Sequence, residues 1–496
     1  MSRLRFVAAS FLAATCLFLS SLTSHAATKA QLEAGYYRIT PFELPENSHL
    51  EAGALQLMPD GRLAVATRFG DIYLISDPLA KAPQASQFKL FASGLHEVLG
   101  LTIHEGWLYA TQRGEVTRMK DTNGDGRADL FETVSDQWGI NGDYHEYAFG
   151  SKMDADHNIW VVLCLTGSFT SEVPWRGWGL RVNADGTTVP VASGIRSPGG
   201  IGTNHLGAMF YTDNQGPWNG TSGLKHLVPG SFQGNPSGNK WYALSDAIGE
   251  RPPDPASGSR FHVEAKKLPQ YIPAAVLFPY NKMGQSASGI ATDFTGGKFG
   301  PFANQMFVGD QTHSTVMRIH LEQVNGRYQG ACFPFIEGLG SGTLSLEFAP
   351  NGALFVGGTD RGWGARGGKP YSLERVEWTG QVPFEIHEMR AQPDGFELTF
   401  TQPVDPATAG DVNSYRLETY TYIYQADYGS PEVDAAQPRI LAAKPAADGK
   451  SVRLVFERVI EGSIHELHLP GVRNREGQPL LHAVGYYTMN QVPAGK

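Results

Sequence analysis

One short pattern occurs six times along the chain. Each copy has a small or apolar lead-in, a tight turn that often reads Pro-Asp-Gly or Pro-Asn-Gly, and then an apolar run. The copies begin at residues 52, 98, 147, 197, 286 and 343. Most starts are therefore about 50 residues apart, which is the size of a four-stranded propeller blade. The pattern predicts an all-β fold with a six-bladed β-propeller over residues 36–380.

Two segments depart from this repeat. Residues 214–285 form a long insertion rich in Gly, Pro, Ser and Asn, and we expect it to be a functional lid or a flexible excursion. From about residue 383 the chain alternates apolar and polar residues with period two, as in "GFELTFTQPVD" and "SVRLVFERV". Residues 383–491 are therefore predicted to form a small Ig-like β-sandwich, to which we assign no chemistry.

The N-terminal residues 1–26 have a basic start, a short apolar run and a small-residue end, as in a secretory signal peptide. We therefore expect a periplasmic or secreted protein with no membrane span. The formal net charge of −9 makes nucleic acid an unsuitable partner. Outside this leader only Cys164 and Cys332 remain, and their spacing leaves a disulfide between them open.

In a propeller, the residues just before each blade's first strand converge on one mouth of the central channel. Here these residues are His49, Glu51, His96, Glu97, Asp143, His145, Glu146, Arg196, Ser197, Gln285, Ser286, Ser341 and Thr343. The stretch "GDYHEYAFG" places His145 between two acids, and a histidine near a carboxylate suits proton transfer. A fixed guanidinium at Arg196 can hold a carboxylate or a developing oxyanion. We predict a catalytic group of His145, Asp143 and Arg196; the alternative is that these are ordinary loop residues.

Residues 121–132, "DTNGDGRADLFE", have the spacing of a calcium-binding loop. The segments on either side resemble strands, so we expect a structural calcium turn between two strands rather than an EF-hand sensor. A plain hairpin turn is the alternative. The oxygen ligands would come from Asp121, Asn123, Asp125, Asp129 and Glu132 and from the carbonyl of Arg127.

Several strings in this order resemble a known family. "GLHEVLGLTIHEGWLYAT", "GDYHEYAFG", "GIRSPGG" and "TDNQGPW" are similar to the glucose/sorbosone dehydrogenase superfamily of soluble six-bladed quinoproteins. "DTNGDGRADLFETV" and "TDNQGPWNGTSGLKHLVPGSF" resemble more closely a family of secreted bacterial propellers described as sorbosone-dehydrogenase-like or membrane-bound dehydrogenase-like. The resemblance covers residues 45–380.

The resemblance implies roles for particular residues. In the quinoproteins a histidine takes the proton from the sugar hydroxyl while hydride passes to pyrroloquinoline quinone (PQQ), and an arginine flanks the cofactor. By motif, His145 would be that base, Asp143 its neighbour and Arg196 that arginine. The implied function is an exported PQQ-dependent sugar dehydrogenase acting on a carbohydrate or alcohol. A separate electron acceptor is implied because the chain has no haem-attachment motif.

The chain departs from this family where the quinone's carboxylates are held. Thr312 and His313 stand near the position of a lysine, no arginine precedes the sixth blade, and Ser197 replaces an asparagine. Either another set holds the quinone, drawn from Arg68, Arg113, Arg361 and Arg366, or no quinone binds. The candidate substrate- or cofactor-binding residues are His49, His96, Glu97, Glu146, Ser197, Asp213, Asn214, Gln215, Trp218, Thr312 and His313.

Two other functions fit the same residues. A carbohydrate-binding propeller without catalysis would use the aromatic and amide groups of the insertion, namely Asn214, Gln215, Trp218 and Asn219. A metal-dependent lactonase- or lyase-like propeller would bind a transition metal on the axis through His49, His96 and His145.

Overall fold

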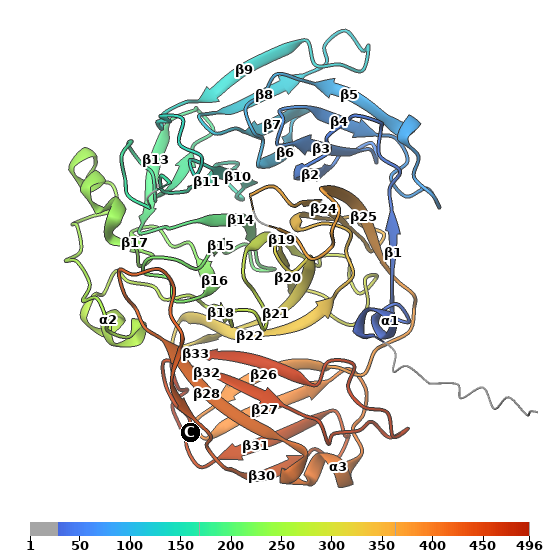
Figure 1. Ribbon diagram of the computed structural model, residues 1–496, viewed down its shortest axis with the longest axis vertical. Helices are drawn as coiled ribbons and strands as arrows, with labels where there is room; N and C mark the ends of the chain where they lie inside the picture. Colours follow the sequence, from blue (N-terminus) through green and yellow to red (C-terminus); the bar gives the residue numbers. More distant parts are fainter. Residues whose placement is uncertain (1–27, 168, 363, 496) are drawn as a thin grey trace, which may run out of the picture.

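The computed structural model describes residues 28–167, 169–362 and 364–495, and it confirms the predicted fold class (Figure 1). Six sheets surround one axis, and a β-sandwich lies against one side of the ring. The predicted signal peptide lies outside the described residues, so export stays a prediction. In the part of the chain that is described, no helix has the length and apolar character needed to cross a membrane.

Each of the first three blades is an antiparallel sheet of four strands consecutive in the chain. They are β2–β5 (Ala52–Leu57, Leu63–Thr67, Ile72–Ile75, Phe88–Ala92), β6–β9 (Gly100–His104, Trp107–Thr111, Val116–Lys120, Leu130–Ser135) and β10–β13 (Ala148–Met153, Ile159–Leu163, Gly179–Val182, Thr188–Ser193). The turn between β2 and β3 explains the Pro-Asp-Gly signature, because Gly61 has a φ of 86°, a left-handed value that favours glycine.

Of the other three blades, the fifth again has four consecutive strands, whereas the fourth and the sixth include a strand that is distant in sequence. The three blades are β14, β15, β16 and β18 (Pro198–Thr203, Met209–Asp213, Ser222–His226, Val276–Phe278), β19–β22 (Ala287–Thr292, Met306–Asp310, Thr315–Val324, Arg327–Ile336), and β23, β24, β25 and β1 (Thr343–Phe348, Ala353–Thr359, Tyr371–Trp378, Tyr37–Pro41). The N-terminal β1 pairs with β25 and so closes the ring.

The predicted insertion is narrower than its sequence suggested, because β16 and β18 are strands of the fourth blade. The excursion itself runs from residue 227 to residue 275. It contains β17 (Ser231–Phe232), which extends the third blade, the 3-10 helix η2 (Pro236–Leu244) and helix α2 (Phe261–Lys267). The remaining helices are all short: α1 (Lys29–Glu33), α3 (Pro406–Gly410), η1 (Ala85–Gln87) and η3 (Val412–Ser414).

The innermost strands of neighbouring blades contact each other around the axis. Glycines permit this approach, since a Cβ on Gly100 would lie 2.2 Å from the carbonyl oxygen of Gly150. Likewise, a Cβ on Gly289 would lie 2.6 Å from the carbonyl oxygen of Leu344. Packing at the axis therefore gives any cavity at the channel mouth a floor.

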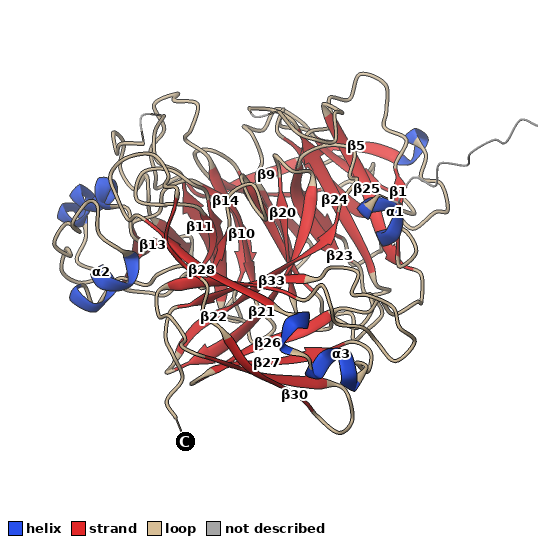
Figure 2. Ribbon diagram, turned by 60° about the horizontal axis from the view of Figure 1, so that its bottom comes forward, coloured by secondary structure: helices blue, strands red, loops and turns tan. Residues whose placement is uncertain are grey.

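The sandwich consists of two four-stranded layers. One is β26, β27, β31 and β30 (Ile386–Gln392, Gly395–Phe400, Ser451–Phe456, Ile440–Pro445), and the other is β33, β32, β28 and β29 (Val484–Met489, Ser463–His468, Arg416–Tyr422, Glu432–Ala436). The second layer continues the fifth blade, because β33 pairs with β22 from Gly330↔Thr488 to Cys332↔Tyr486 (Figure 2). Blade and sandwich thus share one eight-stranded sheet. Cys332 and Cys164 are both buried and unpaired.

Helix α1 is attached to the sandwich by a buried histidine. The imidazole of His482 lies 2.5 Å from a carboxylate oxygen of Glu385 and 2.9 Å from one of Glu33. Burial alone would lower the pKa of His482, but the two carboxylates outweigh it and raise the pKa to about 9. At neutral pH the imidazolium therefore links the N-terminal helix to the sandwich.

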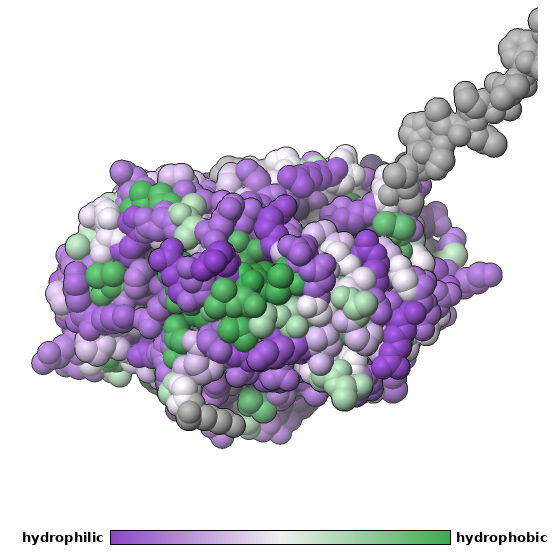
Figure 3. All heavy atoms as spheres, turned by 90° about the horizontal axis from the view of Figure 1, so that it is seen from below, coloured by the Kyte–Doolittle hydropathy of each residue, from purple (hydrophilic) through white to green (hydrophobic). Residues whose placement is uncertain are grey.

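Seen from below, the surface is mostly hydrophilic, with a hydrophobic area near the centre and smaller ones around it (Figure 3). In the sandwich, Leu441 of the edge strand β30 is 54% exposed. The strand ends at Lys444 and Pro445, a charged residue and a residue without a backbone N–H. Both features oppose pairing of this edge with another chain.

The packing at the axis can be tested with Gly100→Ala. The new Cβ would collide with the backbone of the neighbouring blade, so we expect a loss of roughly 2–4 kcal/mol in the free energy of unfolding. Denaturant unfolding measures this loss. Gly364→Ala is the control, because a Cβ there has no atom within 4 Å. Equal stability of the two variants would contradict the close approach of the strands.

Candidate functional site

A cavity of about 270 Å³ lies at the channel mouth, beside the loops that precede the blades' first strands. All six blades contribute to its wall, and the sandwich adds one residue, Tyr428. Three arginines reach the cavity, namely Arg68, Arg196 and Arg361. The site is therefore formed by segments that are far apart in the sequence.

His145 lies on the cavity wall, half-buried, in the segment before β10. Its ring packs against Tyr144 and Phe169, each with ring centroids 5.2 Å away. Asp143 does not bind the imidazole; its carboxylate accepts the backbone N–H of His145 at 2.9 Å. The loop before β10 is thus shaped by a local turn of the kind that aspartate favours.

The pKa of His145 is lowered from 6.5, chiefly by burial and further by the positive charge of Arg196. Arg113 acts in the same direction, whereas Asp143 raises the pKa. The lowering effects dominate, so the imidazole is neutral at neutral pH. A neutral imidazole can accept a proton from a bound substrate.

Arg196 is a buried cation without a carboxylate partner. The residue is only 3% exposed, and its guanidinium lies 3.8 Å from the ring centroid of Phe169 and 5.2 Å from that of Tyr428. Its Nε has no hydrogen-bond partner, and among the described residues no carboxylate oxygen lies within 4.0 Å of the guanidinium. Burial lowers the pKa of Arg196, yet an arginine remains protonated in proteins. The cavity therefore offers one uncompensated positive charge.

Asp213 holds the backbone that carries Arg196. Its carboxylate accepts the N–H of Ser197 at 2.7 Å and that of Arg196 at 3.3 Å. Asp213 is fully buried and forms an ion pair of 2.9 Å with Lys225. The sequence predicts a ligand-binding role for Asp213, but the residue lies behind the wall and positions the loop of Arg196.

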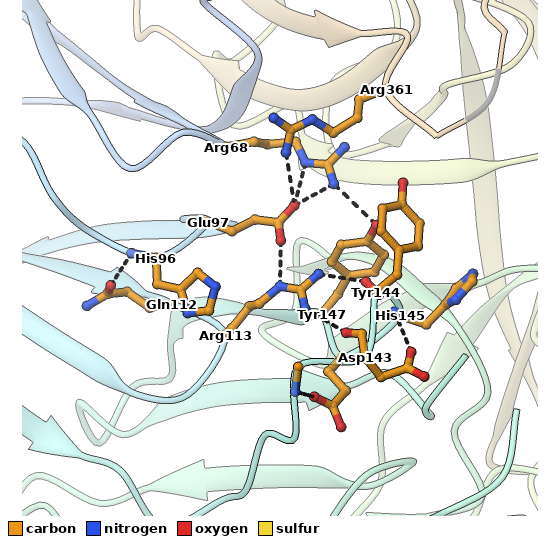
Figure 4. A network of polar contacts seen from close by, with 12 residues as sticks. Arg68, His96, Glu97, Gln112, Arg113, Asp143, Tyr144, His145, Tyr147 and Arg361 are labelled. Carbon is orange, nitrogen blue, oxygen red and sulfur yellow. Dashed lines mark hydrogen bonds and ion pairs between the residues drawn. The ribbon is translucent and has the colours of Figure 1, made fainter. Parts of the chain in front are cut away.

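A second ionic network supports the loop of His145 (Figure 4). Glu97 accepts hydrogen bonds from Arg68 and from Arg113, and Arg113 also donates to the backbone oxygens of Asp143 (2.8 Å) and Tyr144 (2.6 Å). Burial raises the pKa of Glu97, but the two guanidinium charges outweigh it and hold the pKa below its ordinary value. Glu97 therefore stays ionised and anchors two arginines, of which Arg68 lies on the cavity wall and Arg113 does not.

The predicted site residues fall into two groups. Those on the cavity wall are His145, Arg196, Ser197, Asn214, Gln215 and Thr312. Those that do not line the cavity are Asp143, His49, His96, Glu97, Glu146, Asp213, Trp218 and His313. Of the four arginines considered for a quinone, Arg68 and Arg361 lie on the wall, and Arg113 and Arg366 do not.

The residues off the wall have structural contacts instead. Buried Glu146 accepts the backbone N–H groups of residues 141 (2.8 Å) and 142 (3.1 Å). The ring of His49 packs against Phe69, and Trp218 packs against Tyr424. His96 donates its backbone N–H to a glutamine side chain at 2.5 Å. His313 lines a second cavity.

The aromatic residues of the cavity were not found from the sequence. Phe169 contacts both His145 and Arg196 and belongs to the loop after β11. Tyr428 comes from the sandwich, where residues 423–431 reach the mouth, and the N–H of Gly429 donates to Gly216 at 3.2 Å. The sequence assigned no chemistry to the sandwich. That interpretation is corrected by the position of Tyr428, which no local sequence signal could have revealed.

The predicted calcium loop connects β8 and β9 in a hairpin. The carboxylate of Asp121 accepts the N–H groups of Gly124 (2.7 Å) and Gly126 (2.9 Å), and Asp129 accepts the N–H of Thr122 at 2.8 Å. Asn123 and Asp125 accept backbone N–H groups in the same loop. The flanking strands are as expected.

The twelfth position of this loop is engaged elsewhere, because Glu132 lies in β9 and forms an ion pair of 2.5 Å with Arg118. Among the described residues, no three His, Cys, Asp or Glu side chains lie together as a metal-ligand set. The side-chain oxygens that would bind calcium therefore already have other partners. Four of these side chains accept backbone N–H groups within the loop, and Glu132 forms its ion pair with Arg118. The same result means that His49, His96 and His145 do not meet as metal ligands on the axis.

A family model described as "Domain of unknown function (DUF7133)" matches residues 72–334, which is more than half of the chain. The chain belongs to this family. No curated protein matches this DUF7133 member.

Solved structures similar to this DUF7133 member include sugar dehydrogenases. A putative oxidoreductase (glucose dehydrogenase) from Thermus thermophilus is 19% identical, with a TM-score of 0.49 over 68% of this chain and 99% of that one. The PQQ-bound aldose sugar dehydrogenase from Streptomyces coelicolor is 16% identical, with a TM-score of 0.48 over 69% and 98%. The soluble aldose sugar dehydrogenase from Escherichia coli, in its apo-form, is 13% identical, with a TM-score of 0.45 over 70% and 100%.

The electrostatics of this site can be tested by titrating His145. Because Arg196 lowers its pKa, Arg196→Met should raise that pKa, whereas Asp143→Asn should lower it. The measurement is an NMR titration of the imidazole resonances, assigned with His145→Asn. Arg416→Ala, on the exposed surface of the sandwich, is the control and should leave the pKa unchanged. Shifts of the same sign in Arg196→Met and Asp143→Asn would contradict the geometry.

The calcium prediction can be tested separately. A bound cation stabilises the folded state by mass action, so Tm should be higher in CaCl2 than in EGTA, and Asp121→Ala should remove the difference. Asp60→Ala is the matched control, because Asp60 also accepts a backbone N–H in a turn (3.0 Å) but lies outside the loop. Identical Tm values in the two buffers would mean that the loop is a plain hairpin turn.

Proposed function

We propose that this protein is an exported oxidoreductase of the sugar dehydrogenase type, which binds a carbohydrate or alcohol in the mouth cavity. The supporting observation is the pairing of two groups on one wall: the neutral imidazole of His145 and the carboxylate-free guanidinium of Arg196. Phe169 contacts both side chains, with its ring centroid 5.2 Å from that of His145 and 3.8 Å from the guanidinium of Arg196. A base near a fixed cation is the arrangement that oxidation of a hydroxyl needs.

In this proposal His145 accepts the proton of the substrate's hydroxyl group. The oxygen gains negative charge as the proton leaves, and the guanidinium of Arg196 stabilises that charge. Because Arg196 is buried, its interaction with the oxygen is stronger than it would be in water. Arg113 and Asp213 act indirectly, since they hold the loops that carry these two groups.

The cavity also has groups suited to a planar acidic cofactor. PQQ carries three carboxylates, and three arginines line the cavity. Arg68 is paired with Glu97, and Arg361 lies 2.8 Å from Glu51, so only Arg196 is fully available, with its Nε unpartnered. Arg196, Arg361 and Thr312 would hold the cofactor, and Arg68 lies on the same wall in its ion pair with Glu97. When bound, it would supply the two-electron acceptor for the substrate's hydride.

The rest of the wall suits a sugar. Tyr144, Phe169 and Tyr428 present aromatic rings, against which the C–H face of a sugar can pack. Asn214 and Gln215 add amide groups that can bind hydroxyls. These features equally support the second candidate function, carbohydrate binding without catalysis. Proton transfer by His145 distinguishes the two.

The test is dye reduction by the purified protein with PQQ, calcium and an aldose. His145→Ala should reduce kcat by at least about 100-fold, since a general base contributes roughly 10²–10⁴ to the rate. In the unaltered protein kcat/KM should fall as His145 becomes protonated, with a midpoint below 6.5 because its pKa is lowered. An unchanged rate in His145→Ala would exclude this role.

A matched pair of variants separates binding from catalysis. Tyr428→Ala removes a ring from the cavity edge and should raise KM more than it lowers kcat. His145→Ala should retain sugar binding, measured by isothermal titration calorimetry. Sugar binding without turnover in any variant, the unaltered protein included, would support the non-catalytic function instead.

A further inference from the structure

A second cavity of about 210 Å³ lies beside the fifth and sixth blades. It shares no lining residue with the mouth cavity, although the two are adjacent along the loop after β20. In that loop Thr312 lines the mouth cavity, and the next residue, His313, lines the second one. None of the functions considered so far uses this second cavity.

The charged side chains around this cavity are mostly basic. Lys29, Lys282 and Arg366 line it, together with one carboxylate, Glu337. Lys29 is bonded to Glu337 at 2.8 Å, and Lys282 is bonded to two glutamates of the sandwich. Arg366 has no carboxylate within 4.0 Å among the described residues. The guanidinium of Arg366 is therefore the uncompensated charge of the cavity.

The segment that carries Arg366 is fixed to the same loop as His313. The backbone N–H of Arg366 donates to Thr312 at 3.0 Å, and that of Gly367 donates to the hydroxyl of Ser314 at 2.9 Å. The exposed arginine thus extends from an anchored backbone. The two acceptors, Thr312 and Ser314, flank His313 in the chain, so these hydrogen bonds fix the backbone of Arg366 relative to His313.

His313 supplies a buried polar atom that lacks a partner. The residue is 6% exposed, its backbone N–H donates to Asp310 at 2.8 Å, and its Nε2 has no hydrogen-bond partner. A buried polar atom is normally hydrogen-bonded, and an unpaired one next to a cavity is a ready contact for a ligand. Burial lowers the pKa of His313, Asp310 at 3.8 Å from Nδ1 raises it, and Arg366 lowers it; the lowering effects dominate. The neutral imidazole can exchange a hydrogen bond with a hydroxyl group.

We propose that the second cavity binds a small hydroxylated anion, whose charged group contacts Arg366 on the wall that Lys29 and Lys282 also line, and whose hydroxyl contacts the imidazole of His313. Polyhydroxy carboxylates and phosphate monoesters share this chemistry. The site is independent of the oxidoreductase proposal, because it uses neither His145 nor Arg196.

Isothermal titration calorimetry of the full-length protein in phosphate-free buffer tests the site, with gluconate and inorganic phosphate as probes. We expect saturable binding of at least one probe and about a tenfold weaker affinity in Arg366→Ala, because a charge-assisted contact is lost. Arg416→Ala is the control for the loss of an exposed arginine. Binding of gluconate alone identifies a carboxylate site, and binding of phosphate alone identifies a phosphate site.

Arg196 in the mouth cavity could also attract an anion, so Arg196→Met is needed as a second comparison. Binding that survives Arg196→Met and is weakened by Arg366→Ala supports the proposal. Binding that is lost in Arg196→Met and unchanged in Arg366→Ala overturns it, as does the absence of saturable binding for both probes. His313→Gln should weaken binding too, and its Tm shows whether the variant is folded.

Discussion

The close approach of the six innermost strands is the constraint on which the site depends. Their glycines allow backbone to meet backbone at the axis, as Gly100 and Gly289 do. Once the axis is packed, the loops preceding these strands can only gather at the mouth. A side chain at Gly100 would widen the ring and separate those loops. The geometry of the mouth therefore depends on glycines at the points where the innermost strands meet.

Charge at the mouth is organised by buried arginines in a chain whose formal net charge is −9. Arg68 and Arg113 share the carboxylate of Glu97, while Arg176 donates only to backbone oxygens and is so buried that its pKa falls to about 10. The guanidinium of Arg196 forms no ion pair with a carboxylate in the described part of the chain, although Asp213 accepts its backbone N–H. This concentration of fixed positive charge disfavours protonation of His145. Arginines that hold the loops in place thus also help, together with burial, to keep the imidazole of His145 neutral.

Much of the fold could be predicted from the sequence, because the turns and strands of most blades come from one continuous segment of the chain. The rule that residues before each first strand reach the mouth predicted His145, Arg196 and Ser197 on one wall. It was wrong for His49 and Glu97, which do not line the cavity; both have left-handed backbones, with φ values of 42° and 51°. Such backbone values have no sequence signature outside glycine and a few polar residues.

Tyr428 and β1 illustrate the other limit of sequence reasoning. Both act through partners hundreds of residues away, and nothing near either one in the chain encodes that partner. The insertion was misjudged for a related reason, since β18 belongs to a sheet whose preceding strand ends about 50 residues earlier, a separation typical of whole repeats rather than of hairpins.

The shared sheet of β22 and β33 has a consequence for biosynthesis. As the chain emerges from N- to C-terminus, the fifth blade is complete in sequence long before β33, which ends at Met489, is available. During that interval the edge of β22 that faces away from β21 lacks its pairing with β33, and the apolar surface around Met317 and Cys332 lacks the sandwich side chains that cover it. Until then this edge and this apolar surface are open to other chains, and truncation near the C-terminus would leave a blade formed in the middle uncovered on this side.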